Sequence, residues 1–143
     1  MLNVLGRRQV ELNQEGLTLD LRKADLRGFN FPPGSNFSNA DFRGANLAGV
    51  TLKEVIFTSA NLRDVDLEGA DLGEADLINA SLHYANLNRA KLNGAELREA
   101  KLNGAFLYDA DFSDAILKGA DLSCAHVQGA VFREADLEDT ILS

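Results

Sequence analysis

Large apolar residues recur at every fifth position from Phe37 to Leu142, and this spacing restricts the folds that the chain can adopt. The position is filled 22 times without interruption, by 16 leucines, five phenylalanines and Val127. The position two residues earlier is alanine in 17 of 21 repeats. Because one large and one small apolar residue keep fixed places in every repeat, both are predicted to face a crowded interior.

A spacing of five excludes a simple helix and a flat strand. An α-helix turns by about 100° per residue, so the leucines would be distributed around the whole helix. A flat β-strand places alternate residues on opposite faces, so an odd spacing would send successive leucines to opposite sides. Both conflicts disappear if the chain turns a corner within every five residues. Successive coils would then stack about 4.8 Å apart, as in a parallel β-solenoid.

The residues within each repeat unit resemble those of a known family. The units ADLRG, ANLAG, ADLEG, AKLNG and ADLKG resemble those of the pentapeptide repeat proteins, over about residues 17–142. The resemblance implies an all-β fold, the right-handed quadrilateral parallel β-helix of that family. With four sides of five residues, residues 20 apart would stack in columns, and the chain would form about six coils.

Two segments depart from the repeat. Residues 1–16 lack the fivefold pattern and are predicted to form a short helical N-terminal cap over the β-helix of residues 17–143, although a partner-binding segment is the alternative. Pro32–Gly34 adds one residue to the register and suits a turn at a corner, or a binding loop. Residues 3–22 also resemble the entry to the repeats in longer family members, which leaves open that the chain is a piece of a larger protein.

Composition limits the classes of protein to which the chain can belong. The 143 residues suffice for one domain, and the net charge of -8 argues against direct binding to nucleic acid or to anionic membranes. No apolar run approaches the roughly 18 residues of a membrane span, and no signal-peptide pattern begins the chain. A cytoplasmic protein is therefore predicted. One cysteine and two histidines argue against a structural zinc site.

The sequence contains no pattern typical of an enzyme active site. It has no Ser/His/Asp order, no phosphate-binding glycine loop and no metal-spaced cluster, so neither catalytic activity nor a metal or cofactor is predicted. Cys124 and His126 are close in sequence and could suggest a nucleophile with its base. The simpler interpretation is a surface thiol beside a surface imidazole.

One outward column is predicted to be acidic. Residues 20 apart place Glu54, Glu74, Asp114 and Glu134 at one corner, interrupted by Gly94. A second column would add three more acidic residues, namely Asp76, Glu96 and Asp136. Seven carboxylates over this length would approach the charge density of duplex DNA within a factor of two. The resemblance strengthens a DNA-mimic hypothesis, because some pentapeptide repeat proteins bind type II topoisomerases in that way. Interleaved cations argue against it, namely Lys53, Arg98, Lys118 and Arg133.

A second candidate interaction surface is aromatic. Phe106 and Tyr108 are predicted to point outward, with His126 on the next coil. Amide side chains flank them, from Asn86, Asn88 and Gln128. Another side carries outward isoleucines, which could also form an interaction surface, namely Ile56, Ile78 and Ile116.

The C-terminal end is predicted to mediate tail-to-tail dimerisation, as in some relatives. Leu137, Ile141 and Leu142 lie where no polar cap follows, so an apolar face and a strand edge would be left open. Taken together, the sequence predicts a non-enzymatic rigid scaffold that binds an unidentified protein. The alternative is an acidic DNA mimic that binds a DNA-processing enzyme such as a type II topoisomerase.

Overall fold

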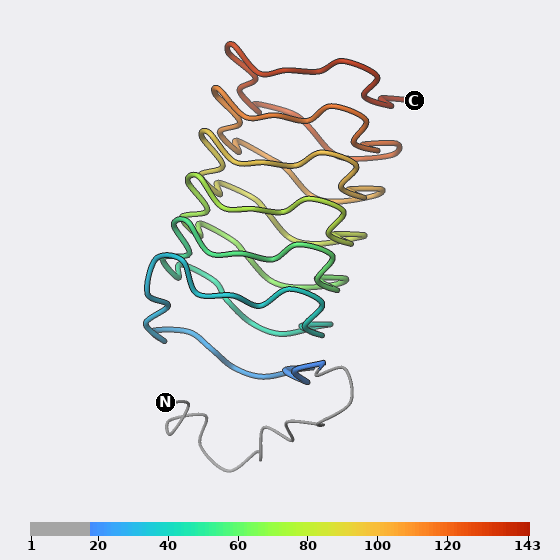
Figure 1. Ribbon diagram of the computed structural model, residues 1–143. Coiled ribbons are helices and arrows are strands. Elements are labelled where there is room, and N and C mark those ends of the chain that lie inside the picture. Colours follow the sequence, from blue (N-terminus) through green and yellow to red (C-terminus); the bar gives the residue numbers. More distant parts are fainter. Residues whose placement is uncertain (1–17) are drawn as a thin grey trace.

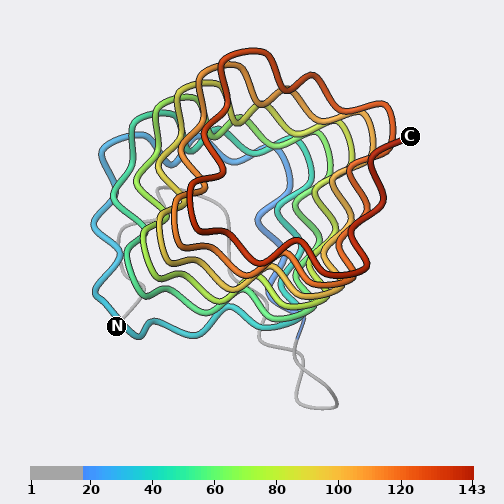
Figure 2. The same cartoon turned by 90° about the horizontal axis from the view of Figure 1, so that it is seen from above.

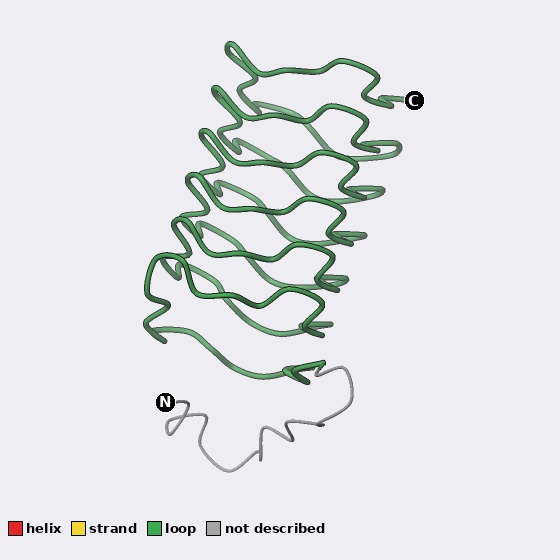
Figure 3. Ribbon diagram, in the orientation of Figure 1, coloured by secondary structure: helices red, strands yellow, loops and turns green. Residues whose placement is uncertain are grey.

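The fold is a stack of four-sided coils. A computed structural model describes residues 18–143, and within this range the chain winds upward in one direction (Figure 1). Viewed along the stack, the coils lie one above another with a four-sided outline (Figure 2). No helix and no strand of several residues occurs between residues 18 and 143, so the ribbon is drawn entirely as loop (Figure 3). In particular, this part of the chain has no helix long and apolar enough to cross a bilayer.

Single-residue parallel bridges replace continuous strands. Asp41 pairs with Asn61, and the same 20-residue step continues to Asp121 and Ile141. Since the chain turns a corner every five residues, a 20-residue step means four sides to a coil. Backbone hydrogen bonds join the coils at every side, for example from Leu87 N–H to the Phe106 carbonyl at 2.8 Å.

The first bridges are spaced differently. Asp25 pairs with Asn46, 21 residues on, whereas Asn36 pairs with Ile56, 20 residues on. One additional residue therefore lies between Asp25 and Asn36. The chain turns at residues 33–34, where Ser35 N–H donates to the Pro32 carbonyl at 3.0 Å.

Each corner contains one residue in the left-handed backbone conformation. Within residues 18–143 nine glycines have a positive φ, but so do 15 other residues, among them Glu54 and Tyr84. This conformation costs an L-residue about 1–2 kcal/mol relative to a right-handed one. The backbone hydrogen bonds between coils nevertheless hold each corner in place. The repeat therefore accepts many residue types at the left-handed position, although glycine adopts this conformation at the lowest cost.

The interior is filled by the two apolar positions of the repeat. The inward leucines and alanines from Ala40 to Leu122 are at most 3% exposed. Near the beginning of the stack the interior is aromatic. The ring centroid of Phe57 lies 6.0 Å from that of Phe37 and 5.5 Å from that of Phe42. The sequence prediction of a crowded interior is confirmed for these coils.

Two further expectations remain predictions. The helical cap of residues 1–16 lies outside the described residues. The count of about six coils also depends on residues before position 18, and it is not established by the described part of the chain.

Candidate functional site

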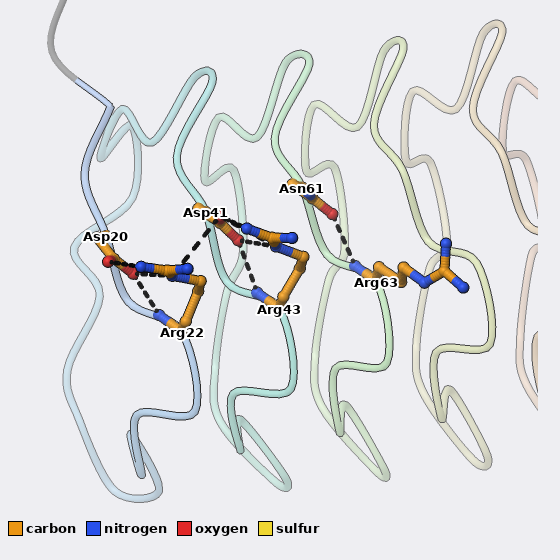
Figure 4. Close-up of polar contacts among 6 residues, drawn as sticks. All are labelled: Asp20, Arg22, Asp41, Arg43, Asn61 and Arg63. Carbon is orange, nitrogen blue, oxygen red and sulfur yellow. Dashed lines mark hydrogen bonds and ion pairs between the residues drawn. The ribbon is translucent and has the colours of Figure 1, made fainter.

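In 13 repeats between residues 18 and 143, an Asp or Asn that precedes the inward leucine or phenylalanine supports the backbone of the following corner. Asp41 Oδ1 accepts a hydrogen bond from Arg43 N–H at 3.1 Å, and Asn61 Oδ1 accepts one from Arg63 N–H at 3.3 Å (Figure 4). Eleven other aspartates and asparagines do the same, namely Asp20, Asp25, Asn36, Asn46, Asp66, Asp71, Asp76, Asn86, Asp111, Asp121 and Asp136. These are Asx turns, for which only short polar side chains have the right reach.

This structural role was not predicted from the sequence. The preference for Asp and Asn over Glu and Gln at this position was the available signal. It indicates a structural role for many of the carboxylates and amides.

Several of these carboxylates also pair with arginine. Arg22 and Arg43 donate to Asp20 and Asp41 at 2.6 and 2.7 Å, side by side along one face (Figure 4). Hydrogen bonds from the Arg22 side chain and then from its N–H lower the pKa of Asp20 to about 2. Arg27 has the same effect on the pKa of Asp25. The first coil therefore presents neutral ion pairs, not a free basic patch.

Acidification is expected to destabilise this end of the β-helix between about pH 4 and pH 2. An unfolded aspartate titrates near 3.9. Because the folded pKa of Asp20 and Asp25 is lower, their contribution is fully present above pH 4 and is lost as the pH falls toward 2. Urea midpoints measured at pH 6, 4, 3 and 2.5 should fall. Arg22→Gln with Arg27→Gln should flatten this dependence, and an unchanged slope in that variant would contradict the assignment.

The acidic column, defined as Glu54, Glu74, Asp114 and Glu134, forms as predicted in backbone terms. All four are exposed corner residues with φ between 56° and 60°. Within residues 18–143 none of them forms an ion pair. Gly94 occupies the gap, and the side chain of Glu74 leans toward it.

In the second predicted column only Glu96 forms an ion pair within residues 18–143, with Arg98 at 3.0 Å. Asp76 accepts from Thr58 Oγ1 at 2.9 Å and from a backbone N–H, and Asp136 accepts from a backbone N–H, but these hydrogen bonds leave both side chains charged. Six carboxylates of the two columns therefore lack an ion pair in the described part of the chain, and over about 19 Å they correspond to about one charge per 3 Å, compared with one per about 1.7 Å in duplex DNA. The charge density is about half that of DNA.

The aromatic patch, defined as Phe106, Tyr108 and His126, is brought together on one side. Phe106 and His126 form a bridge pair, and their rings stack 5.0 Å apart at 4°. The Tyr108 ring lies 5.8 Å from that of His126. Phe106 is 38% exposed and Tyr108 is 36% exposed, so the patch presents stacked rings to solvent. The isoleucines of the other side, Ile56, Ile78 and Ile116, are half-buried and form no comparable exposed patch.

The Cys124 and His126 pair has no arrangement for nucleophilic catalysis. Both are exposed, and no hydrogen bond joins them in the described range. Residues 18–143 also contain no group of three or more histidine, cysteine, aspartate or glutamate side chains placed to hold a metal ion.

Tyr84 lies over Gly104 of the next coil. The guanidinium carbon of Arg63 is 5.4 Å from the Tyr84 ring centroid. A Cβ on Gly104 would lie 2.6 Å from Tyr84 Cε1, so glycine leaves room for the ring.

Replacing Gly104 with alanine is expected to lower the free energy of unfolding by about 1–2 kcal/mol, because its φ is +65° and the Tyr84 ring must move. Urea unfolding followed by circular dichroism gives this value. The same substitution in a Tyr84→Ala background should be less destabilising. An equal effect in both backgrounds would show that the ring contact contributes nothing.

The inward position of the repeat is more exposed in the last coil than in the preceding coils. Val127, Leu137 and Leu142 are 41%, 38% and 66% exposed, which agrees with the expectation that an apolar face is left open at this end. Nothing between residues 18 and 143 packs over this coil. The N–H groups of Val127 and Leu137 have no acceptor in that range, whereas the equivalent Leu107 N–H donates to the His126 carbonyl at 2.8 Å. Dimerisation through Leu137, Ile141 and Leu142 stays a prediction that light scattering can test.

Comparisons with known proteins agree with this architecture. The sequence matches the family described as pentapeptide repeats, in eight copies, over residues 35–73, 60–98, 90–129 and 110–143. No curated protein matches it.

Three solved structures illustrate the similarity. The pentapeptide repeat protein Rfr23 from the cyanobacterium Cyanothece 51142 is 27% identical over 72% of this chain and 91% of that one, with a TM-score of 0.47. HetL, a pentapeptide repeat protein involved in heterocyst differentiation regulation from Nostoc sp. strain PCC 7120, is 32% identical over 88% and 65%, with a TM-score of 0.44. A trypsin-treated form of QnrB1, a plasmid-mediated fluoroquinolone resistance protein, is 21% identical over 88% and 78%, with a TM-score of 0.55.

The family match covers more than half of the chain, and its fold, a right-handed β-helix, agrees with the parallel bridges and fivefold corners described above. The chain therefore belongs to the pentapeptide repeat family.

Proposed function

We propose that this protein is a non-enzymatic scaffold that binds another protein through side chains on the outside of its β-helix. The observation that carries the proposal is the aromatic patch. Phe106, Tyr108 and His126 are exposed although neighbouring coils place polar residues in the same columns. Large rings in contact with solvent are typical of protein-binding surfaces.

The decisive experiment is affinity capture from the native host with three forms of the protein. A patch variant carries Phe106→Asn and Tyr108→Ser, and a column variant carries Glu54→Gln, Glu74→Gln, Asp114→Asn and Glu134→Gln. We expect a specific partner to bind the wild-type protein and the column variant but not the patch variant. Retention of every partner by the patch variant would refute a role for the patch, provided that both variants keep the wild-type circular dichroism spectrum.

A DNA mimic is the second candidate, and the acidic column is the observation in its favour. Its four carboxylates are exposed and unpaired within the described residues. QnrB1, whose fold is similar, is a fluoroquinolone resistance protein, but at 21% identity the similarity extends to the fold alone. A gyrase supercoiling assay tests this candidate. Inhibition or protection by the wild-type protein and not by the column variant would support it, and no effect at tens of micromolar would exclude gyrase as the target.

A further inference from the structure

We infer that the aromatic patch binds an arginine side chain of the partner protein, with Asp109 as its counterion. This inference rests on the proposed function, because it names the chemistry that the same patch recognises.

The patch replaces a structural residue of the repeat. Phe106 stands where the preceding coils use Asp or Asn, so the N–H of Tyr108 lacks the Asx acceptor that those coils provide. Asn88 of the preceding coil supplies an acceptor instead, because its Oδ1 lies 3.0 Å from Tyr108 N. Other residues between 18 and 143 that precede an inward apolar residue also lack Asp or Asn. At none of them does a side chain of a neighbouring coil accept a hydrogen bond from the N–H left without an Asx acceptor. The aromatic residue is therefore accommodated by a compensating contact, unlike the isoleucines of the other side.

A free carboxylate stands beside the rings. Asp109 follows Tyr108 at the corner, and its Oδ1 lies over Gly129 of the next coil, where a Cβ would collide with it. Asp109 is exposed, and no cation pairs with it within residues 18–143. Arg89, which occupies the same column one coil earlier, is already bonded to Glu68. The patch thus combines partly exposed aromatic rings, of which Phe106 and His126 are stacked on each other, with an unpaired negative charge.

Arginine matches both features. Its planar guanidinium stacks on aromatic rings, and its fork of N–H groups bonds a carboxylate with two parallel hydrogen bonds. A lysine ammonium can provide the charge, but it lacks the plane and the fork. The net charge of -8 favours approach of a basic segment and opposes a nucleic acid, whose bases could otherwise stack on the same rings.

Short peptides provide the probe. Four acetylated pentapeptides differ only at the central residue, which is arginine, lysine, citrulline or leucine, and each is titrated into isotope-labelled full-length protein at 50 mM salt. We expect the arginine peptide to shift the Phe106, Tyr108 and His126 signals and to bind at least about fivefold more tightly than the citrulline and leucine peptides. Equal affinity for the citrulline or leucine peptide would overturn the inference.

Two variants and one matched control complete the test. Phe106→Asn restores the residue that the repeat prefers and so keeps the fold, and Asp109→Asn removes only the charge. Each should weaken binding of the arginine peptide about fivefold or more. Asp114→Asn removes the same charge from an equivalent left-handed corner on the next side, and it should leave binding unchanged. An equal loss in Asp114→Asn would show plain electrostatic attraction and overturn the inference.

The outcomes separate this inference from the proposed function. If no arginine peptide binds but the patch variant still loses its captured partner, the arginine inference is wrong and the scaffold proposal stands. If the arginine peptide binds the patch but the patch variant retains every partner, the patch recognises arginine and the scaffold proposal is wrong for this surface.

Discussion

Replacing Phe57 with alanine is expected to lower the free energy of unfolding by about 3–5 kcal/mol, the largest effect expected of a single substitution here. The Phe57 side chain is completely buried. It stacks on Phe37 of the preceding coil and meets Phe42 edge to face, at centroid distances of 6.0 and 5.5 Å. Alanine would leave a cavity between coils and remove both aromatic contacts.

Phe57→Leu is the matched control for this prediction. Leucine occupies the same column in later coils, at Leu77, Leu97 and Leu117, and each is fully buried there. The leucine variant should therefore lose less than half as much stability as the alanine variant in urea unfolding monitored by circular dichroism. Equal losses would mean that aromatic packing, not filled volume, stabilises this part of the stack.

Replacing Ala100 with leucine is expected to cost about 3 kcal/mol, at the upper end of the range for overpacking a core. Ala100 is completely buried, and the same column holds Ala80 and Ala120, which are also completely buried. The added atoms must displace the inward leucines of adjacent coils or separate the coils themselves. Either response weakens the backbone hydrogen bonds that join them.

Ala100→Val controls for side-chain size. Valine occupies the equivalent place on other sides, at Val50, Val55 and Val65, with at most 3% exposure. We expect a smaller loss for valine than for leucine in the same urea experiment. A leucine variant as stable as the wild-type protein would show that the interior is wider than the structure indicates.

Much of the fold could be predicted because the fivefold repeat indicates which residues face the interior and where the chain turns. The inward leucines and alanines, the corner in every five residues and the 20-residue stacking all follow from one period combined with the family resemblance. The extra residue at Pro32–Gly34 was visible as a break in that period. The helical cap of residues 1–16 was predicted because Leu2, Leu5 and Leu12 could line one side of a short helix, and it lies outside the described residues.

The candidate site was only partly predictable. Columns could be assigned from residue numbers, so the contact between Phe106 and His126 was foreseeable. Whether each charged side chain forms an ion pair could not be predicted, because pairing depends on the direction in which the side chain points. Glu96 and Asp76 are engaged by Arg98 and Thr58, whereas Asp109 and Glu74 are left without an ion pair in the described residues.

The sequence alone therefore determined the interior and the corner in every five residues, since both follow from buried apolar residues at a strict period, whereas the four-sided coil and its 20-residue register were implied by the family resemblance. Only the tertiary structure decided the roles of the polar residues. Where an Asp or Asn side chain accepts the N–H two residues on, as Asp41 and Asn61 do, it supports the next corner, a role that cannot be read from the net charge. The physical reason is distance: a period fixes which residues share a column, but hydrogen bonds and ion pairs form within about 3–4 Å and depend on side-chain length and direction.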